Sequence, residues 1–288
     1  MPTLALTASN AQSVGGTVLL AGLQTSQKNG NGLFTPLAAQ AAPLPGTYVL
    51  SRFLEEQIAR LGPARHAQLA MQPMDLQTMP CQISGDITVS SDASSVTEAF
   101  NACSDLAGES VSGVIAISGF ASTPSSFSAS VSINLTFSVS GFPDQNFTGS
   151  FGISETGLGS NATTITISGA DLVLRQGAST EDLGNFSFST TIDTSTSDAT
   201  NSVSFMYSSA EIGGTVSVTT LTPFQTSPGK TFPHAGAIQI TGVNGSAIRI
   251  TVNGDESGPA PQVTIQLDAN GDGVFDLTLN RNWSDLTA

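Results

Sequence analysis

The feature that most constrains the fold is a strict two-residue alternation from Phe127 to Val139. Every odd position in this segment is apolar, and every even position carries Ser, Asn or Thr. Successive side chains of a β-strand point to opposite faces, so the segment predicts a strand with one apolar face and one hydroxyl-rich face. At ~3.4 Å per residue the strand would be about 44 Å long, more than twice the usual length.

The same one-sided alternation continues through most of the chain after Gln82. It recurs at Val111/Ile115/Ile117, Phe147/Phe151/Ile153, Ile165/Ile167, Phe186/Phe188/Ile192, Val203/Phe205/Tyr207, Val216/Val218, Ile238/Ile240, Ile248/Ile250/Val252, Val263/Ile265/Leu267 and Phe275/Leu277/Leu279. Antiparallel strands that cover a core on one side only show this pattern. Short connections with turn residues separate the segments, as at 141–144 and 244–245. The sequence therefore predicts a mainly β protein built as a large antiparallel meander.

The first eighty residues lack this period and predict helices instead. We expect two parts: residues 1–80, an N-terminal helical segment with linkers, and residues 81–288, the antiparallel β domain. One helix is expected to start at Ser9-Asn10-Ala11-Gln12 and run through Val14, Val18, Leu19 and Leu23, although Gly15-Gly16 weakens this prediction. A stronger apolar stripe predicts a second helix over 48–61, and the Pro/Gly-rich residues 29–47 predict a connection between them.

The apolar faces of so many strands need a partner layer. The sheet can fold on itself as a sandwich or barrel, or curve as a half-barrel around the N-terminal helix or helices. We favour the half-barrel, because the helix at 48–61 has an apolar stripe to bury. Two independent units, one helical and one β, form the next alternative.

Charge and composition point away from several classes of partner. The chain has 22 acidic and 8 basic residues, for a formal net charge of −14. Such a chain repels phosphate backbones and anionic lipid headgroups, so we expect no nucleic-acid partner. No stretch approaches the ~20 apolar residues of a transmembrane helix. Charged residues make up only 10% of the chain, and the hydroxyl-rich composition favours an extracellular, cell-surface or periplasmic location.

Two cysteines, Cys81 and Cys103, flank a strand-like segment. In an oxidising compartment they would form a disulfide worth roughly 3 kcal/mol; two buried free thiols are the alternative. Direct pairing of the two cysteines across a hairpin would require that paired residue numbers add up to an even value. Placing Ile87 and Phe100 on one face requires an odd value. Either a β-bulge lies in this hairpin, or the two segments are not simple partners.

The one specific motif lies near the C-terminus, at residues 268–276. Its sequence, Asp-Ala-Asn-Gly-Asp-Gly-Val-Phe-Asp, matches the first nine positions of a calcium loop. The predicted ligands for Ca²⁺ are the side chains of Asp268, Asn270, Asp272 and Asp276 and the main-chain carbonyl of Val274. At position 12, Leu279 replaces the bidentate glutamate, so we expect modest affinity and a structural ion. A turn that binds no metal is the alternative.

The segment resembles the D-x-D-x-D-G-x-x-D hairpin loops of integrin-type propeller repeats, which bind calcium between two strands. That resemblance covers about nine residues and implies no propeller. The wider order of motifs resembles uncharacterised exported proteins and lipoproteins of Gram-negative bacteria. It consists of Leu6-Thr7-x-x-Asn10-Ala11-Gln12, the two cysteines, Thr241-Gly242-x-x-Gly245-Ser246-x-x-Arg249-Ile250-Thr251-Val252, the Asp loop and Trp283. This resemblance implies an exported protein and transfers no function.

No catalytic constellation stands out, so we expect a protein that is not an enzyme. The only histidines, His66 and His234, are interpreted as loop residues, and Glu55 and Glu56 as a solvated helix face. No G-x-S-x-G motif is present. Three further acidic residues, Asp171, Glu181 and Asp182, are assigned to loops as solubilising groups.

Two functions remain open. The first is a non-enzymatic extracellular or cell-surface protein, structural or adhesive, with possible self-association or a cell-surface partner and a structural calcium ion. The alternative is a periplasmic half-barrel carrier of an apolar, lipid-like ligand, an architecture that resembles the periplasmic lipoprotein carriers. Its lining would include Phe127, Phe137, Phe147, Phe151, Phe186, Phe188 and Phe205, which serve equally well as an ordinary core.

Overall fold

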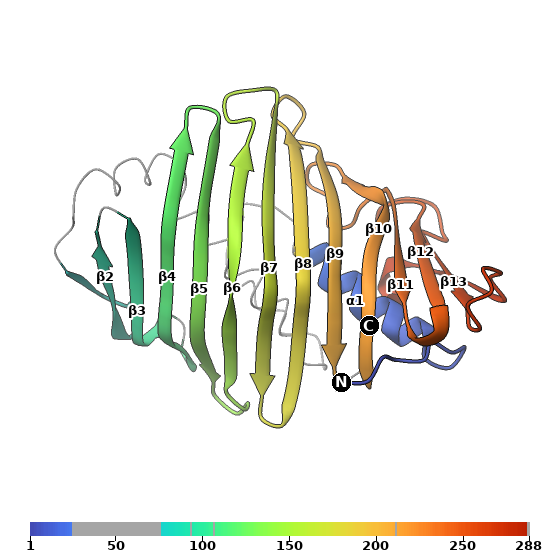
Figure 1. Ribbon diagram of the computed structural model, residues 1–288, viewed down its shortest axis with the longest axis horizontal. Coiled ribbons are helices and arrows are strands. Elements are labelled where there is room, and N and C mark those ends of the chain that lie inside the picture. The colour runs from blue at the N-terminus through green and yellow to red at the C-terminus, as the bar shows by residue number, and fades with distance from the viewer. Residues whose placement is uncertain (25–75, 93, 106, 211, 287–288) are drawn as a thin grey trace.

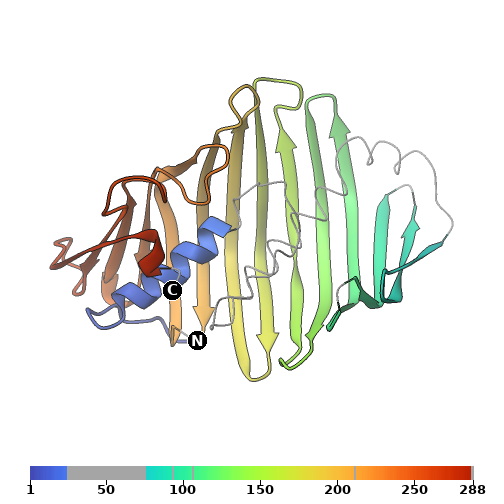
Figure 2. The ribbon, with the colours of Figure 1, turned by 180° about the vertical axis from the view of Figure 1, so that it is seen from behind.

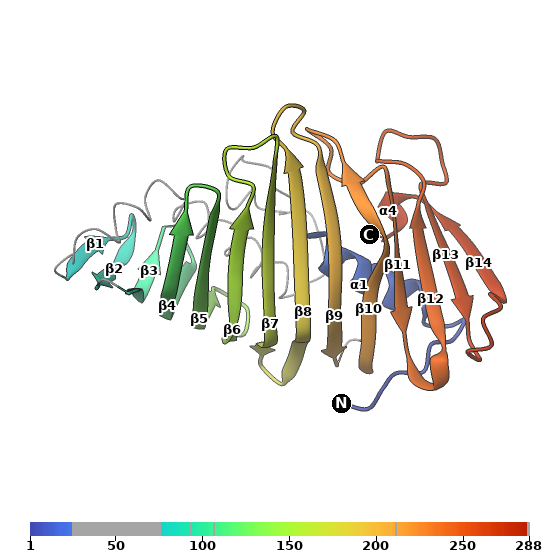
Figure 3. The ribbon, with the colours of Figure 1, turned by 45° about the horizontal axis from the view of Figure 1, so that its top comes forward.

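The computed structural model describes residues 1–24, 76–92, 94–105, 107–210 and 212–286. Its fourteen strands form one antiparallel sheet in which every strand pairs with its neighbours in sequence, from β1 to β14 (Figure 1). The predicted mainly β meander is therefore confirmed. The sheet is single and stays open, with β1 and β14 at its two edges, which decides against a sandwich or a closed barrel (Figure 3).

Within the described residues, one helix precedes the strands and a second helix follows them. Helix α1 spans Ala11–Gln24, the 3₁₀ turn η1 spans Val243–Gly245, and α4 spans Trp283–Leu286. The strands are β1 Gln77–Pro80, β2 Ser84–Ser91, β3 Ser95–Ser104, β4 Glu109–Thr123, β5 Ser126–Val139, β6 Gln145–Thr156, β7 Ala162–Gln176, β8 Ser179–Asp193, β9 Ala199–Ser209, β10 Gly214–Thr226, β11 Ala235–Thr241, β12 Ala247–Val252, β13 Val263–Asp268 and β14 Leu277–Arg281. Strand β1 begins four residues before the expected domain boundary at 81.

Strand β5 shows why the sequence forms a one-sided sheet. Its odd residues from Phe127 to Phe137 are buried, and the even ones between them are half-buried or exposed. We call the face with the apolar residues the inner face and the opposite one the outer face. The inner-face residues of β3 to β13 join α1 and α4 in one hydrophobic core.

The alternation changes parity within β7 and β8, which the sequence pattern did not predict. In β7 the inner residues are Ile165 and Ile167 before the change and Leu172 and Leu174 after it. The register slips between Ser150/Asp171 and Phe151/Gly169, which leaves Ala170 as a bulge. A second register shift in β8 accompanies the positive φ of Asn185. These bulges re-aim side chains and let a long, twisted sheet keep one apolar face.

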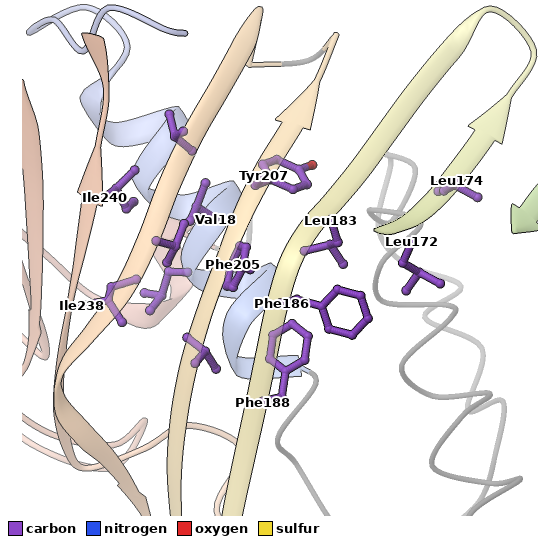
Figure 4. Close-up of a cluster of buried hydrophobic side chains, with 14 of the residues drawn as sticks. Val18, Leu172, Leu174, Leu183, Phe186, Phe188, Phe205, Tyr207, Ile238 and Ile240 are labelled. Atoms are coloured by element: carbon purple, nitrogen blue, oxygen red, sulfur yellow. The ribbon is translucent and has the colours of Figure 1, made fainter. Parts of the chain in front are cut away.

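Helix α1 covers the inner face over β9 and β11 to β13 (Figure 2). Its residues Val14, Val18 and Leu19 are buried, as the sequence pattern predicted. Val18 points at the sheet among Phe205, Ile238 and Ile240 (Figure 4). Gly15 does not break the helix but allows its close approach, because an added Cβ would lie 3.3 Å from Ile250 Cδ1. The second predicted helix, over 48–61, and the connection at 29–47 lie outside the described residues.

The chain before α1 also pairs with the sheet. Thr3 forms a parallel bridge with Thr215, and the main chain of Leu4 bonds to Thr215 and Val243. The segment thus extends the sheet beside β10, where β11 has ended at Thr241. None of the helices in the described part of the chain is long and apolar enough to cross a membrane.

Candidate functional site

The predicted calcium loop connects β13 to β14 at one end of the sheet. Asp268, the last residue of β13, is buried with 3% of its surface exposed. Its two carboxylate oxygens accept main-chain N–H groups, Oδ1 from Gly271 at 2.7 Å and Oδ2 from Gly273 at 2.8 Å. Both glycines have positive φ, a conformation that side chains disfavour. The Asp and Gly positions of the motif therefore fold the loop around one buried carboxylate.

The other predicted ligands stay on the exposed side of this loop. Asn270 Oδ1 accepts the N–H of Asp272, Asp272 Oδ1 accepts the N–H of Val274, and Asn270 Nδ2 donates to Asp272 Oδ2 at 3.0 Å. Asp276 lies where the strand resumes, with its N–H bonded to Leu267 O. The predicted ligands thus lie along one short loop, and the side-chain oxygens of Asp268, Asn270 and Asp272 accept loop N–H groups.

Two contacts hold the loop against the neighbouring hairpin. The guanidinium of Arg249, on β12, lies 4.6 Å from the centroid of the Phe275 ring, a cation–π contact. Gly271 passes so close to the η1 turn that an added Cβ would lie 2.4 Å from Asn244 O. The loop is therefore fixed in place by side chains and main chain outside the motif, which sequence spacing alone did not indicate.

The predicted disulfide is present between Cys81 and Cys103, with a Cα–Cα distance of 5.5 Å. Of the two alternatives left open for this hairpin, the structure shows the β-bulge, because the register shifts between Ser84/Ser104 and Asp86/Asn101. Among the described residues, one group of three His, Cys, Asp or Glu ligand atoms comes within 4.8 Å of one another, namely Cys81, Cys103 and Asp105. Its sulfurs are oxidised to the disulfide, so this group does not present thiolates to a metal.

The outer face between β4 and β9 carries rows of hydroxyl groups. Three neighbouring rows comprise eighteen positions, of which sixteen are Ser or Thr and the other two are Ala121 and Gly152. They are Thr123, Ser126, Thr156, Thr164, Thr191 and Thr200; Ala121, Ser128, Ser154, Thr166, Ser189 and Ser202; and Ser118, Ser130, Gly152, Ser168, Ser187 and Ser204. Hydroxyls bond across strands, as between Thr164 Oγ1 and Thr191 Oγ1 at 2.8 Å. This part of the outer face is uncharged in a chain of net charge −14.

Two carboxyl groups lie side by side next to this uncharged area. Asp171 and Asp182 belong to β7 and β8, so their assignment to loops was wrong, and Glu181 likewise lies in β8. Asp171 and Asp182 fit in strands because their outer face is solvated. Glu181 lies on the inner side, paired with Leu174, and accepts a hydrogen bond from Tyr207 Oη at 3.2 Å. Burial, followed by a hydrogen bond and like charge from Asp171, raises the pKa of Asp182 to about 6. Asp182 Oδ1 is buried without a hydrogen-bond partner.

The raised pKa of Asp182 predicts a pH-dependent stability of defined sign. Because the folded state binds this proton more tightly than the unfolded state, stability falls as pH rises from about 4 to about 6. We expect Asp182→Asn to raise the free energy of unfolding at pH 8 by about 1 kcal/mol, a value reduced for solvent screening, and to have little effect below pH 4. Urea titrations at both pH values measure this.

The control for Asp182 is an aspartate whose pKa moves the other way. Hydrogen bonds from Ser195 and Thr196 lower the pKa of Asp193 at the β8–β9 turn. Asp193→Asn is therefore expected to destabilise the protein at pH 8. A difference in the free energy of unfolding between the wild type and Asp182→Asn that is the same at pH 4 and at pH 8 would contradict the raised pKa of Asp182.

The inner face holds the seven phenylalanines that were considered as a ligand lining. All seven are buried within the single core. One polar residue, Asn201 on β9, shares this face with 1% of its surface exposed, next to Phe224 and Thr190 in the strand ladder. Its side-chain oxygen Oδ1 has no hydrogen-bond partner. The sequence pattern missed Asn201 because it occupies an odd position among otherwise apolar ones.

Residues considered for catalysis give no constellation within the described residues. His234 lies in the β10–β11 connection, where its main-chain N–H bonds to Gln225 O. His66, Glu55 and Glu56 lie outside the described residues. Comparison with protein-family models, with curated proteins and with solved structures found no match to this chain. The case for a function therefore depends on the geometry above.

Proposed function

We propose that this chain is a non-enzymatic, extracytoplasmic structural or adhesive protein whose C-terminal hairpin holds a structural calcium ion. The observation that supports this best is the outer face, where sixteen hydroxyl side chains, an alanine and a glycine fill three rows without a charge. An ordinary solvated sheet of an acidic protein mixes charged residues into such rows. The disulfide fits an oxidising compartment.

The loop geometry supports the calcium part of this proposal. Asp268 is anchored by two N–H groups, which leaves lone pairs on both carboxylate oxygens for a cation. Asp272 and Asp276 add two further carboxylates within eight residues, and hard cations prefer such oxygen ligands. The bound ion would replace weak contacts such as Asn270 to Asp272 and clamp β14 to β13. Its role is to stiffen the last hairpin.

The calcium part is tested by thermal unfolding of EDTA-treated protein during a calcium titration. At tenfold excess over the dissociation constant, binding to the folded state adds about 1.4 kcal/mol, which raises Tm by a few degrees. We expect Asp272→Ala with Asp276→Ala to abolish the shift. Asp144→Ala with Asp198→Ala removes the same charge from two other exposed loops and should leave the shift intact. Equal shifts in both double variants would contradict the site.

The structural role is tested by size-exclusion chromatography coupled to light scattering, with calcium and with EDTA. A structural or adhesive module is expected to self-associate at high concentration, and calcium is expected to favour the associated form. A strict monomer that is indifferent to calcium would count against the role. This readout does not depend on knowing the biological partner.

A carrier of an apolar, lipid-like ligand is the second candidate, and Asn201 is the observation that favours it. A buried amide oxygen without a partner costs about 1–3 kcal/mol, and a ligand with one hydrogen-bond donor would satisfy it. Native mass spectrometry of the purified protein tests this directly. Co-purified lipid that is lost in Asn201→Leu supports the carrier, and a ligand-free wild-type spectrum contradicts it.

A further inference from the structure

We propose that the β1 edge of the sheet is a self-association surface, at which two copies of the chain pair their β1 strands antiparallel across a twofold axis. The inference rests on the proposed structural role and names the contact through which copies join. The result would be one continuous sheet running through both molecules. Four observations at this edge carry the inference.

The first observation is apolar exposure. Leu76, Met79 and Ile83 lie in or beside β1, and 70%, 47% and 57% of their surfaces are exposed. No strand among the described residues pairs with the outer side of β1. Sheet edges in soluble proteins are usually guarded by charges, and exposed apolar edge strands tend to pair with other chains. The β1 edge therefore has the properties of a pairing surface.

The second observation is the absence of charge. Residues 76–85 contain no Asp, Glu, Lys or Arg, although the chain as a whole has a net charge of −14. Two acidic molecules repel each other, so a contact between copies is least costly where neither copy presents a charge. Aspartates flank both edge strands, with Asp75 before β1 in sequence and Asp86 paired with Pro80, and with Asp276 and Asp285 on either side of β14. The strands themselves differ, because β14 ends in Arg281 whereas β1 holds no charged residue. The charge distribution favours β1 over β14 as the joining edge.

The third observation is the direction of the main-chain groups. Cys81 donates its N–H to Gly85 O, in register with the pairs Met79/Ile87 and Gln77/Val89. In an antiparallel ladder every second pair is hydrogen-bonded, so the main-chain N–H and C=O groups of these odd residues of β1 point toward β2. The N–H and C=O groups of Thr78 therefore point outward. Pro80, the next outward residue, offers only its C=O.

The fourth observation is self-complementarity about Thr78. A twofold axis at this residue lets each Thr78 exchange N–H···O=C bonds with Thr78 of a second copy. Leu76 of one copy then lies opposite Pro80 of the other, where its N–H meets a carbonyl and its side chain meets the proline ring. Each such pair keeps one of its two main-chain bonds, from the Leu76 N–H to the Pro80 carbonyl, because the proline has no N–H to donate to Leu76 O. A second copy of β1 is the occupant that this pattern fits.

The contact is small, so the expected assembly is a reversible dimer. Interfaces below about 1,200 Å² belong to weak or transient complexes. Sedimentation velocity over a wide concentration range is expected to show a monomer–dimer equilibrium for the wild type. The disulfide, which fixes the turn beside β1, should be kept oxidised throughout. Pairing of β1 with β14 of another copy would instead give open chains of many copies.

Thr78→Pro and Thr278→Pro form a matched pair of variants. Thr278 is the second residue of β14. The Asn253 N–H to Gln262 O bond fixes which residues of β13 bond to β12, and the β13–β14 register then places the Thr278 N–H outward as well. Proline is tolerated at both positions, since neither N–H belongs to the ladder. We expect Thr78→Pro to remain monomeric at concentrations where the wild type and Thr278→Pro dimerise. Circular dichroism and Tm confirm that each variant is folded.

Cross-linking gives an independent readout. Thr78→Cys is expected to form a disulfide-linked dimer on mild oxidation, because paired Cα atoms about 5.5 Å apart are within disulfide reach. Thr88→Cys, opposite Thr78 on β2 and on the same face, is one strand further from the axis and should not cross-link.

The outcomes separate this inference from the proposed function. Dimerisation that survives Thr78→Pro but is lost in Thr278→Pro overturns the β1 contact and leaves a self-associating structural protein. A wild type that is monomeric at every concentration overturns both. Dimerisation through β1 without any response to calcium leaves the contact standing and contradicts only the expected coupling of calcium to self-association, because the calcium loop lies at the opposite edge of the sheet.

Discussion

Replacing Leu135 with aspartate is expected to unfold the protein. Leu135 lies at the middle of β5, is fully buried, and is paired with Gly113 and Phe147 on the inner face. The substitution removes a buried apolar side chain and introduces a charge without a partner there. Together these cost about 5 kcal/mol or more, which is comparable with the whole stability of a typical domain. Far-ultraviolet circular dichroism with a thermal scan measures the loss.

The matched control for Leu135→Asp is the same substitution one residue earlier. Asn134 is exposed on the outer face, opposite Val114 and Thr148. Asn134→Asp is expected to change the free energy of unfolding by about 0.5 kcal/mol or less. Comparable losses in the two variants would mean that the two faces of β5 do not differ in burial.

Trp283→Ala is expected to lower the free energy of unfolding by about 3–5 kcal/mol and Tm by about 10 °C. Trp283 begins α4 and is 2% exposed. Its ring stacks on Phe232 with centroids 4.4 Å apart, and its Nε1 donates to Gly254 O at 2.9 Å. The substitution leaves a cavity and an unpaired carbonyl. It also separates the loops before β11 and β13 from the C-terminus.

Two further variants divide the contribution of Trp283. Trp283→Phe keeps most of the stacking but loses the bond to Gly254, so we expect an intermediate loss of about 1–2 kcal/mol. Ser284→Ala, at the next and exposed position of α4, is the control and should be neutral. Equal losses for the phenylalanine and alanine variants would show that the hydrogen bond, and not the packing, carries the effect.

The sequence predicted the meander because the alternation is a local consequence of strand geometry. From Phe127 to Phe137 each odd residue is buried, and the register of β4 to β6 keeps these residues on one face. The bulges at Ala170 and Asn185 were missed. A bulge adds one residue without a distinctive composition, so only pairing with the neighbouring strand reveals it.

Local rules also failed where tertiary packing overrides them. Gly15 and Gly16 weakened the predicted helix at the N-terminus, yet α1 forms, its apolar residues pack into the core, and Gly15 lies close to Ile250. Helix propensity does not include this close approach. Asp171 and Asp182 were assigned to loops as solubilising groups, but they lie in β7 and β8, where an outer face in water accepts them.

The candidate site was predictable in part. The Asp loop and the cysteine pair were identified from spacing, and the mismatch in parity between Cys81 and Cys103 indicated the bulge that the hairpin contains. The contact of Arg249 with Phe275 was not predictable, since it joins β12 to the β13–β14 loop, which is distant from β12 in sequence. Calcium binding itself remains a prediction that the titration above tests.

Cysteine labelling along β5 tests the central claim, a single sheet with one buried and one wet face. Single cysteines at 128, 130 and 132 on the outer face and at 129, 131 and 133 on the inner face are treated with a thiol reagent under native conditions, with the Cys81–Cys103 disulfide intact. We predict that the three even positions react fast, and that the three odd positions are protected until the protein is unfolded. Equal reactivity at all six positions, or a three- to four-residue period, would contradict it.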